Sequence, residues 1–182
     1  CSVPEMAAFL AANLLPARRI AANWKPDAMH VHFAVPTGVL GWLLHRMTRI
    51  PYILSTQLGD VPGGVPEQTD HLFRWVKPFT VPIWRDAAAV TAPSQFIREL
   101  AVKSYGVPVE VVPNGVDISR ISRSPAPPHD PVRLVFAGRF SPQKNLLFLL
   151  DILKKLEGEN WDLDLLGDGP MMGALRTAVD RA

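Results

Sequence analysis

The feature that most constrains the fold of this chain is the alternation of short apolar runs with helical patterns. The apolar runs, each four to six residues long, span 28–33, 52–56, 87–91, 109–112, 133–137 and 162–166. Helical patterns occupy 4–22, 37–48, 94–105, 145–156 and 171–181. Short strands separated by helices predict an α/β fold with parallel sheets covered on both faces. Such sheets bind ligands beyond the carboxyl ends of their strands, at a topological switch point, so the residues after each strand form the candidate site.

Proline and small polar residues predict where the helices begin and break. We expect Pro16 to bend or break the first helix. A helix that starts at Thr69 should be interrupted at Pro78 and Pro82. The N-caps of the helices over 37–48 and 94–105 are predicted to be Thr37 and Ser94.

A proline-rich stretch over 119–131 has the composition of a linker between domains. It divides the chain into a first domain over 1–121, a linker over 122–131 and a second domain over 132–182. Each domain would contain part of a Rossmann-like parallel sheet. The strands before and after the linker are few for two closed sheets, so we expect both domains to be incomplete. The first residue is not Met, which suggests that the natural start lies upstream.

Composition excludes several classes of protein. A hydrophobic fraction of 48% with 20% charged residues predicts a folded globular chain. The net charge of +2, without a long block of Lys or Arg, argues against a nucleic-acid partner. Cys1 is the one cysteine, so an intrachain disulfide is excluded and a cytoplasmic setting fits best. The apolar helix over 4–22 ends near Arg18 and Arg19, which would allow peripheral contact with the inner face of the cytoplasmic membrane, although burial in the core explains the same pattern.

The strongest chemical signal lies after the strand at 133–137. Gly138 would let a ligand approach the backbone, and Arg139 and Lys144 flank a loop that opens into a helix. Two cations beside free helix N–H groups suit a diphosphate, because they combine charge neutralisation with oriented donors. An ordinary loop with two exposed basic side chains explains the spacing equally well.

The other candidate sites are weaker when each is taken alone. The Gly167-Asp168-Gly169 turn departs from a dinucleotide fingerprint, because the next glycine comes too late. Asp60, in a glycine-rich loop, is the one group there able to bind sugar hydroxyls or act in acid–base chemistry. His30 and His32 share one face of a strand, but two ligands do not make a metal site, and no metal is expected.

Taken together, these motifs resemble the retaining glycosyltransferases of family four, which have the two-domain GT-B fold. The stretches that carry the resemblance are HVHF at 30–33, LGDVPG at 58–63, TAPS at 91–94, PNGVD at 113–117, FAGR at 136–139 with Lys144, and LGDGP at 166–170. Their order and spacing are specific, although each motif is modest alone.

The resemblance implies an enzyme that needs no metal or other cofactor and uses a nucleotide sugar as donor and a glycan or lipid-linked sugar as acceptor. The first domain would hold the acceptor, with His32, Gln57, Gly59 and Asn114 at the cleft and Asp60 as the candidate catalytic group. The second domain would bind the donor diphosphate through Gly138, Arg139 and Lys144, beside a loop with Gly167 and Asp168. Cations at this position would stabilise the departing nucleoside diphosphate as the glycosidic bond breaks.

Two departures from the family pattern qualify what the resemblance implies. The family often has His at the position of Gln57, and an amide can hydrogen-bond a sugar but cannot shuttle protons. The chain stops at Ala182, before the paired-glutamate motif that contacts the donor sugar, so we expect this piece alone to be inactive. Two other interpretations stay open: a non-catalytic nucleotide-sugar or phosphate binding module, and a dinucleotide-dependent oxidoreductase, which the interrupted glycine pattern argues against.

Overall fold

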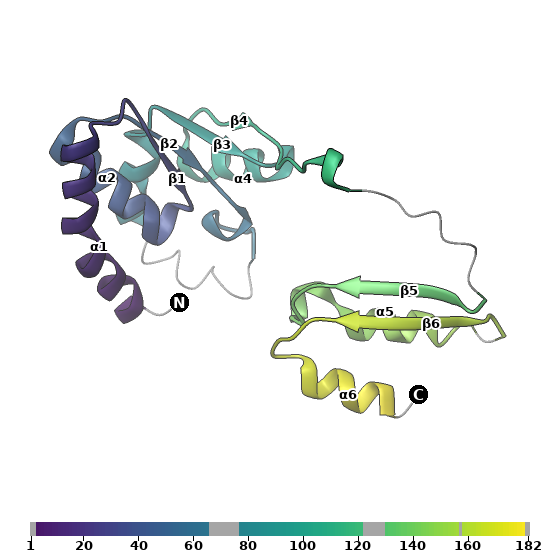
Figure 1. Cartoon of the computed structure of the whole chain (residues 1–182). Coiled ribbons are helices and arrows are strands. Elements are labelled where there is room, and N and C mark those ends of the chain that lie inside the picture. Colours follow the sequence, from purple (N-terminus) through teal and green to yellow (C-terminus); the bar gives the residue numbers. More distant parts are fainter. Residues whose placement is uncertain (1–2, 66–76, 122–129, 157, 181–182) are drawn as a thin grey trace. The chain divides into compact units, whose positions relative to one another are not determined.

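A computed structural model describes residues 3–65, 77–121, 130–156 and 158–180 (Figure 1). The chain forms two compact units, Cys1–Val116 and Asp117–Ala182. Each unit is built on its own parallel sheet, which confirms the predicted α/β class with two Rossmann-like sheets. The units divide a few residues before the predicted boundary at residue 121. The predicted linker over 122–131 lies mostly outside the described residues, and the roles assigned to the two domains stay predictions.

The first unit contains a four-stranded parallel sheet in the order β1-β2-β3-β4. Its strands are β1 (Met29–His32), β2 (Tyr52–Ser55), β3 (Ala89–Ala92) and β4 (Glu110–Val111), close to the predicted runs. Its helices are α1 (Val3–Trp24), α2 (Val39–Thr48), α4 (Gln95–Tyr105) and a helical segment over 77–85. Because the order runs in one direction, the expected topological switch point is not found among these four strands.

The described helices bury one face of this sheet. Val31, Leu54 and Val90 point into a core that also contains Ile83 and Ile97 from the helices. The opposite face exposes the His side chains of β1, so the expectation of cover on both faces is wrong for the described residues. The physical reason lies in the alternation of β1, Met-His-Val-His, which is the pattern of a strand buried on one side only.

Prolines interrupt the helices less than expected. Helix α1 continues through Pro16, and the helical segment over 77–85 continues through Pro82. Pro78 is the second residue of that segment and the residues before 77 lie outside the described ranges, so the interruption expected at Pro78 stays a prediction. Pro16 removes the N–H partner of the Ala12 carbonyl, but both residues are exposed, so water can satisfy that carbonyl. The predicted start at Thr69 lies outside the described residues.

One predicted N-cap is confirmed and the other is wrong. Ser94 caps α4, where its side chain accepts a hydrogen bond from Ile97 N, and Gly106 ends the helix in a left-handed conformation. Thr37 lies instead in a kinked turn before α2, and its hydroxyl donates back to the carbonyls of His32 and Phe33. The backbone carbonyls at the end of β1 therefore bind the hydroxyl that was expected to cap the helix.

The second unit pairs β5 (Val132–Ala137) with β6 (Trp161–Leu166) over six residue pairs. Helices α5 (Leu146–Leu153) and α6 (Met172–Asp180) cover one face of this sheet, around a core of Phe140, Leu146 and Leu175. These elements confirm the predicted strand–helix repeat. Among the helices that the structure describes in both units, none combines the length and apolar character that crossing a membrane requires.

Candidate functional site

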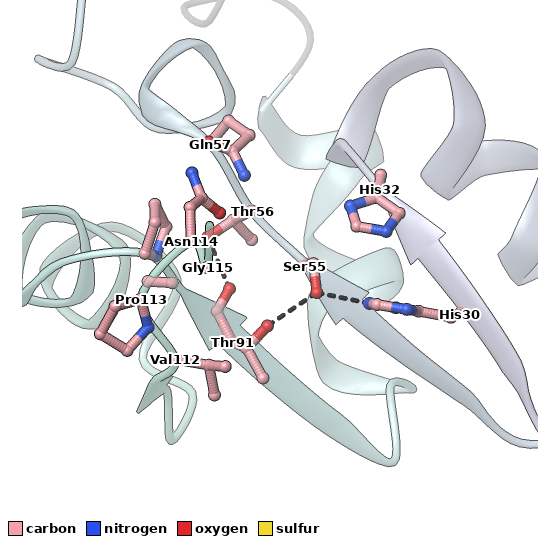
Figure 2. Close-up of a pocket in the computed structure, with 12 residues that line it drawn as sticks. His30, His32, Ser55, Thr56, Gln57, Thr91, Val112, Pro113, Asn114 and Gly115 are labelled. Atoms are coloured by element: carbon pink, nitrogen blue, oxygen red, sulfur yellow. Dashed lines mark hydrogen bonds between the residues drawn. The ribbon is translucent and has the colours of Figure 1, made fainter. Parts of the chain in front are cut away.

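A pocket of about 180 Å³ lies where the four strands of the first sheet end (Figure 2). Parallel strands bring their carboxyl ends to one edge, so residues far apart in sequence meet there. The lining residues are His30, His32, Ser55, Thr56, Gln57, Thr91, Ala92, Pro93, Val112, Pro113, Asn114 and Gly115. Every strand of this sheet contributes residues from its end or from the segment that follows it.

Three strands contribute to a chain of hydrogen bonds along the floor of this pocket. His30 Nε2 lies 2.7 Å from Ser55 Oγ, and Ser55 Oγ lies 2.8 Å from Thr91 Oγ1 (Figure 2). The register explains the contact, because Ser55 pairs with both His32 and Thr91 across the sheet and therefore points to the same face. Thr56 donates its hydroxyl to the Thr91 carbonyl at 3.0 Å and fixes the end of β2 beside β3.

The two His side chains of β1 form a contiguous aromatic surface at one side of the pocket. The ring centroids of His30 and His32 are 4.2 Å apart, with the rings tilted by 43°. This confirms that they share a face. The described residues contain no group of three or more His, Cys, Asp or Glu that could hold a metal ion, and the expected metal independence stays a prediction.

Gln57 and Asn114 approach the pocket from two loops (Figure 2). The Gln57 side chain accepts a hydrogen bond from the backbone N–H of Asp60, which fixes it. Within the described ranges, no protein group is hydrogen-bonded to the Asn114 amide, so it remains able to bind a ligand. The structure thus brings together His32, Gln57 and Asn114 of the predicted acceptor-side residues. Gly59 is not among the residues that line the pocket.

Asp60 does not line the pocket, and its carboxylate joins two loops. Its Oδ1 accepts from Ala34 N at 2.9 Å and its Oδ2 from Gln57 N at 2.8 Å, and the residue is only 6% exposed. Burial raises the pKa of this carboxyl to about 6, against the lowering effect of backbone hydrogen bonds from Gln57, Ala34 and Val35. In this geometry the carboxylate holds the two loops together. A catalytic role for Asp60 remains a prediction.

The predicted donor-side residues gather at the carboxyl edge of the second sheet. Gly138 N donates to Leu166 O at 2.9 Å, and Phe140 N donates to the Asp168 carbonyl at 2.8 Å. A Cβ on Gly167 would lie 1.9 Å from the Gly138 carbonyl oxygen, so the two loops touch closely enough to require glycine. The loops after β5 and β6 therefore form one surface.

Arg139 and Lys144 lie in the loop that leads from β5 to α5, and both are exposed. Lys144 ends a short helical turn over Pro142–Lys144, directly before the left-handed Asn145. In the part of the chain that the structure describes, neither cation is paired with a carboxylate. Both side chains are thus available to an anionic ligand, and their assignment to a diphosphate remains a prediction.

Sequence reasoning missed Ser55 and Thr91 as pocket residues. Both lie within predicted strands, over 52–56 and 87–91, whereas the candidate site was expected among the residues that follow each strand. The signal that could have found them is the period-two alternation, which places Ser55 and Thr91 on the same face as His30 once neighbouring strands are aligned in parallel.

Comparison with known proteins places these features in a family. The sequence profile of Glycosyltransferase Family 4 matches residues 2–120, more than half of the chain, and this segment contains the whole pocket lining. The chain is also 28% identical over 160 residues to TuaC of Bacillus subtilis (strain 168), which carries the name of a teichuronic acid biosynthesis glycosyltransferase. The alignment covers 82% of this chain and 40% of TuaC, so the chain spans less than half the length of that relative. The chain belongs to Glycosyltransferase Family 4.

Proposed function

We propose that this chain is part of an enzyme that transfers a sugar from a nucleotide-sugar donor to a glycan or lipid-linked sugar acceptor. The transfer retains the configuration at the anomeric carbon and uses no metal ion. In this proposal the first unit binds the acceptor and the second binds the diphosphate of the donor. Family membership supports glycosyl transfer. The residues described above support the assignment of the acceptor to the first unit and of the donor diphosphate to the second.

The observation that carries the proposal is the polar pocket at the carboxyl ends of the first sheet. Hydroxyl, amide and imidazole groups line it, together with the backbone of the segment over 112–115. Such groups both donate and accept hydrogen bonds, as the hydroxyls of a sugar require. A pocket at this edge is also where parallel α/β sheets bind their ligands.

The second unit supports the proposal through two unpaired cations in the loop after β5, Arg139 and Lys144. As the bond between the sugar and the nucleoside diphosphate breaks, negative charge grows on the diphosphate. Arg139 and Lys144 would stabilise that charge more strongly in the transition state than in the ground state, which accelerates the reaction. This half of the mechanism requires no protein nucleophile.

The proposed acceptor is a bacterial polysaccharide or its lipid-linked precursor, in line with the name of TuaC. We place the enzyme in the cytoplasm, where nucleotide sugars would be its donors, with peripheral contact at the inner face of the cytoplasmic membrane. Helix α1 supports that contact, because Ile20 and Trp24 are 61% and 77% exposed near Arg18 and Arg19.

The test is a transfer assay on the full-length protein with a panel of nucleotide sugars and lipid-linked glycan acceptors, in the presence of a metal chelator. We expect a glycosylated product whose anomeric configuration, read by NMR, equals that of the donor. Nucleotide-sugar binding without any product would favour the non-catalytic binding module. Inversion, or complete dependence on a metal ion, would overturn the corresponding part of the proposal.

A further inference from the structure

We propose that the pocket of the first unit binds an anionic group of the acceptor, either a carboxylate or a phosphate ester. The identification of this ligand as the acceptor rests on the proposed function. The preference for an anion follows from the residues that line the pocket. None of the twelve lining residues is Asp or Glu. His30 and His32 are the lining side chains that can carry a charge, and the charge they carry is positive.

Two carboxylates adjoin lining residues, but neither of them lines the pocket. Both carboxylate oxygens of Asp60 accept hydrogen bonds from backbone N–H groups, those of Ala34 and Gln57. Glu110 pairs with Thr91 in the sheet register, but it is exposed and outside the lining. The pocket interior is therefore neutral when both imidazoles are neutral, and positive when either carries an additional proton.

The hydrogen-bond chain has two possible directions, and an anion selects one of them. When His30 donates from Nε2 to Ser55, the Ser55 hydroxyl donates to Thr91, and the Thr91 hydrogen remains free to point at a ligand. In the reverse direction Thr91 donates to Ser55 and offers only lone pairs to the pocket. An anionic ligand accepts hydrogen bonds only, so it favours the first direction.

Two further groups are free to contact the same ligand. The structure records no hydrogen bond from the described residues to the ring of His32 or to the Asn114 amide. Both line the pocket beside the Ser55 and Thr91 hydroxyls (Figure 2). The volume of about 180 Å³ equals that of about six water molecules. It therefore suits one charged group with part of its sugar ring.

The experiment compares three probes of similar size on the full-length protein: glucose, glucuronate and glucose 6-phosphate. Binding is measured by NMR titration, following the imidazole signals of His30 and His32. We expect glucuronate or glucose 6-phosphate to bind at least tenfold more tightly than glucose, and the better of the two identifies the source of the charge. Equal affinity for all three probes would overturn the proposal.

A pair of variants tests the direction of the hydrogen-bond chain. Thr91→Val keeps the shape of the side chain but removes its hydroxyl, and we expect it to weaken binding of the anionic probe about ten- to a hundredfold. Thr91→Ser keeps the hydroxyl and should retain most of the affinity. Ser104→Ala, on α4 and outside the lining, is the control for removing a hydroxyl elsewhere. Wild-type affinity in Thr91→Val would contradict the inference.

Charge is tested by His32→Gln, which keeps a hydrogen-bonding side chain but cannot become a cation. We expect it to reduce the preference for the anionic probe over glucose at least fivefold, while affinity for glucose changes little. The same samples are assayed for sugar transfer. Transfer without any anion preference would overturn this inference and leave the proposed function intact. Anion binding without transfer would support this inference and contradict the proposed function.

Discussion

At Asp60, burial and hydrogen bonding act on the carboxylate in opposite directions. Removal from water favours the neutral acid, whereas the N–H groups of Ala34 and Gln57 favour the anion, and burial is the larger effect. In the sequence, Asp60 is a candidate catalytic group because it lies in a glycine-rich loop. The structure shows that it holds the loops after β1 and β2 together, and so shapes the pocket indirectly.

The raised pKa of Asp60 predicts a pH dependence of stability. The folded carboxyl has a pKa of about 6 and the free side chain one of 3.8, so the folded state binds the proton more tightly. The contribution of Asp60 to the free energy of unfolding should therefore fall as the pH rises from about 4 to about 7, by roughly 3 kcal/mol at most.

This dependence is measured by urea unfolding of the chain at a series of pH values, beside the Asp60→Asn variant. Other carboxylates titrate in both proteins, so the difference between the two pH profiles isolates Asp60. We expect the wild-type protein to lose stability relative to the variant as the pH rises through 6. Parallel profiles would show that the folded carboxyl titrates in its ordinary range.

The residues of the site were predictable only where chemistry and position coincide in the sequence. His32, Gln57 and Asn114 each follow or end a predicted strand, so they were found. Ser55 and Thr91 were not found, because their role depends on which strands are neighbours and in what register. Register is a property of pairs of strands, and a single strand does not encode it.

At the scale of elements, the loops after β5 and β6 depend on glycine for their contact. Replacing Gly167 by Ala would place a Cβ 1.9 Å from a backbone oxygen, so the loops must separate. We expect Gly167→Ala to lower the free energy of unfolding by about 2 kcal/mol or more.

The matched control is Gly173→Ala, inside α6, where a Cβ would meet no described atom within 4 Å. Because Gly173 lies in the first turn of α6, this change should stabilise the chain by less than the roughly 0.5–1 kcal/mol that Gly→Ala gives in a helix interior. Both variants are compared by denaturant unfolding. A Gly167→Ala variant as stable as the wild-type protein would show that the loops do not approach so closely in solution.

Helix α4 provides a second test of local structure. Its cap is a hydrogen bond of 3.3 Å from Ile97 N to Ser94 Oγ. Ser94→Ala should destabilise the first unit by about 1 kcal/mol, and Ser94→Asp should restore most of that loss. Thermal unfolding followed by circular dichroism measures both variants. An equal loss in both would show that the serine contributes through packing and not through its cap.

Most elements could be predicted because their signals are local. Apolar runs and the Ser94 cap predicted the positions of strands and helices to within a few residues. The break expected at Pro16 was wrong because the effect of a proline on a helix depends on solvent exposure, which the local sequence does not reveal. The half-covered first sheet was missed for a similar reason, since four-residue strands contain too few positions to separate alternation from continuous burial.

At the scale of the whole molecule, the proposed division of labour predicts that the two substrates respond to separate sets of residues. Arg139→Ala or Lys144→Ala should lower kcat/KM for the donor about ten- to a hundredfold, because each removes a charge-assisted contact. Asn114→Ala should raise KM for the acceptor and leave KM for the donor unchanged.

These effects are measured by varying one substrate at saturation of the other in the full-length enzyme. Lys103→Ala removes an exposed cation of α4 and serves as the control for loss of charge. Unchanged donor kinetics in both cation variants would remove Arg139 and Lys144 from the donor site. An effect of Asn114→Ala on the donor alone would reverse the assignment of the first unit.

The strand order of the first sheet has a consequence for how the protein is made. Each strand pairs with the strands next to it in the sequence, so β2 can add to β1, β3 to β2 and β4 to β3 as the chain leaves the ribosome. Among the four strands that the structure describes, none inserts between two others, which keeps the loops that close between them short. Of these elements, the segment after β4 emerges last during synthesis and completes the pocket lining, so ligand binding reports that all four described strands have assembled.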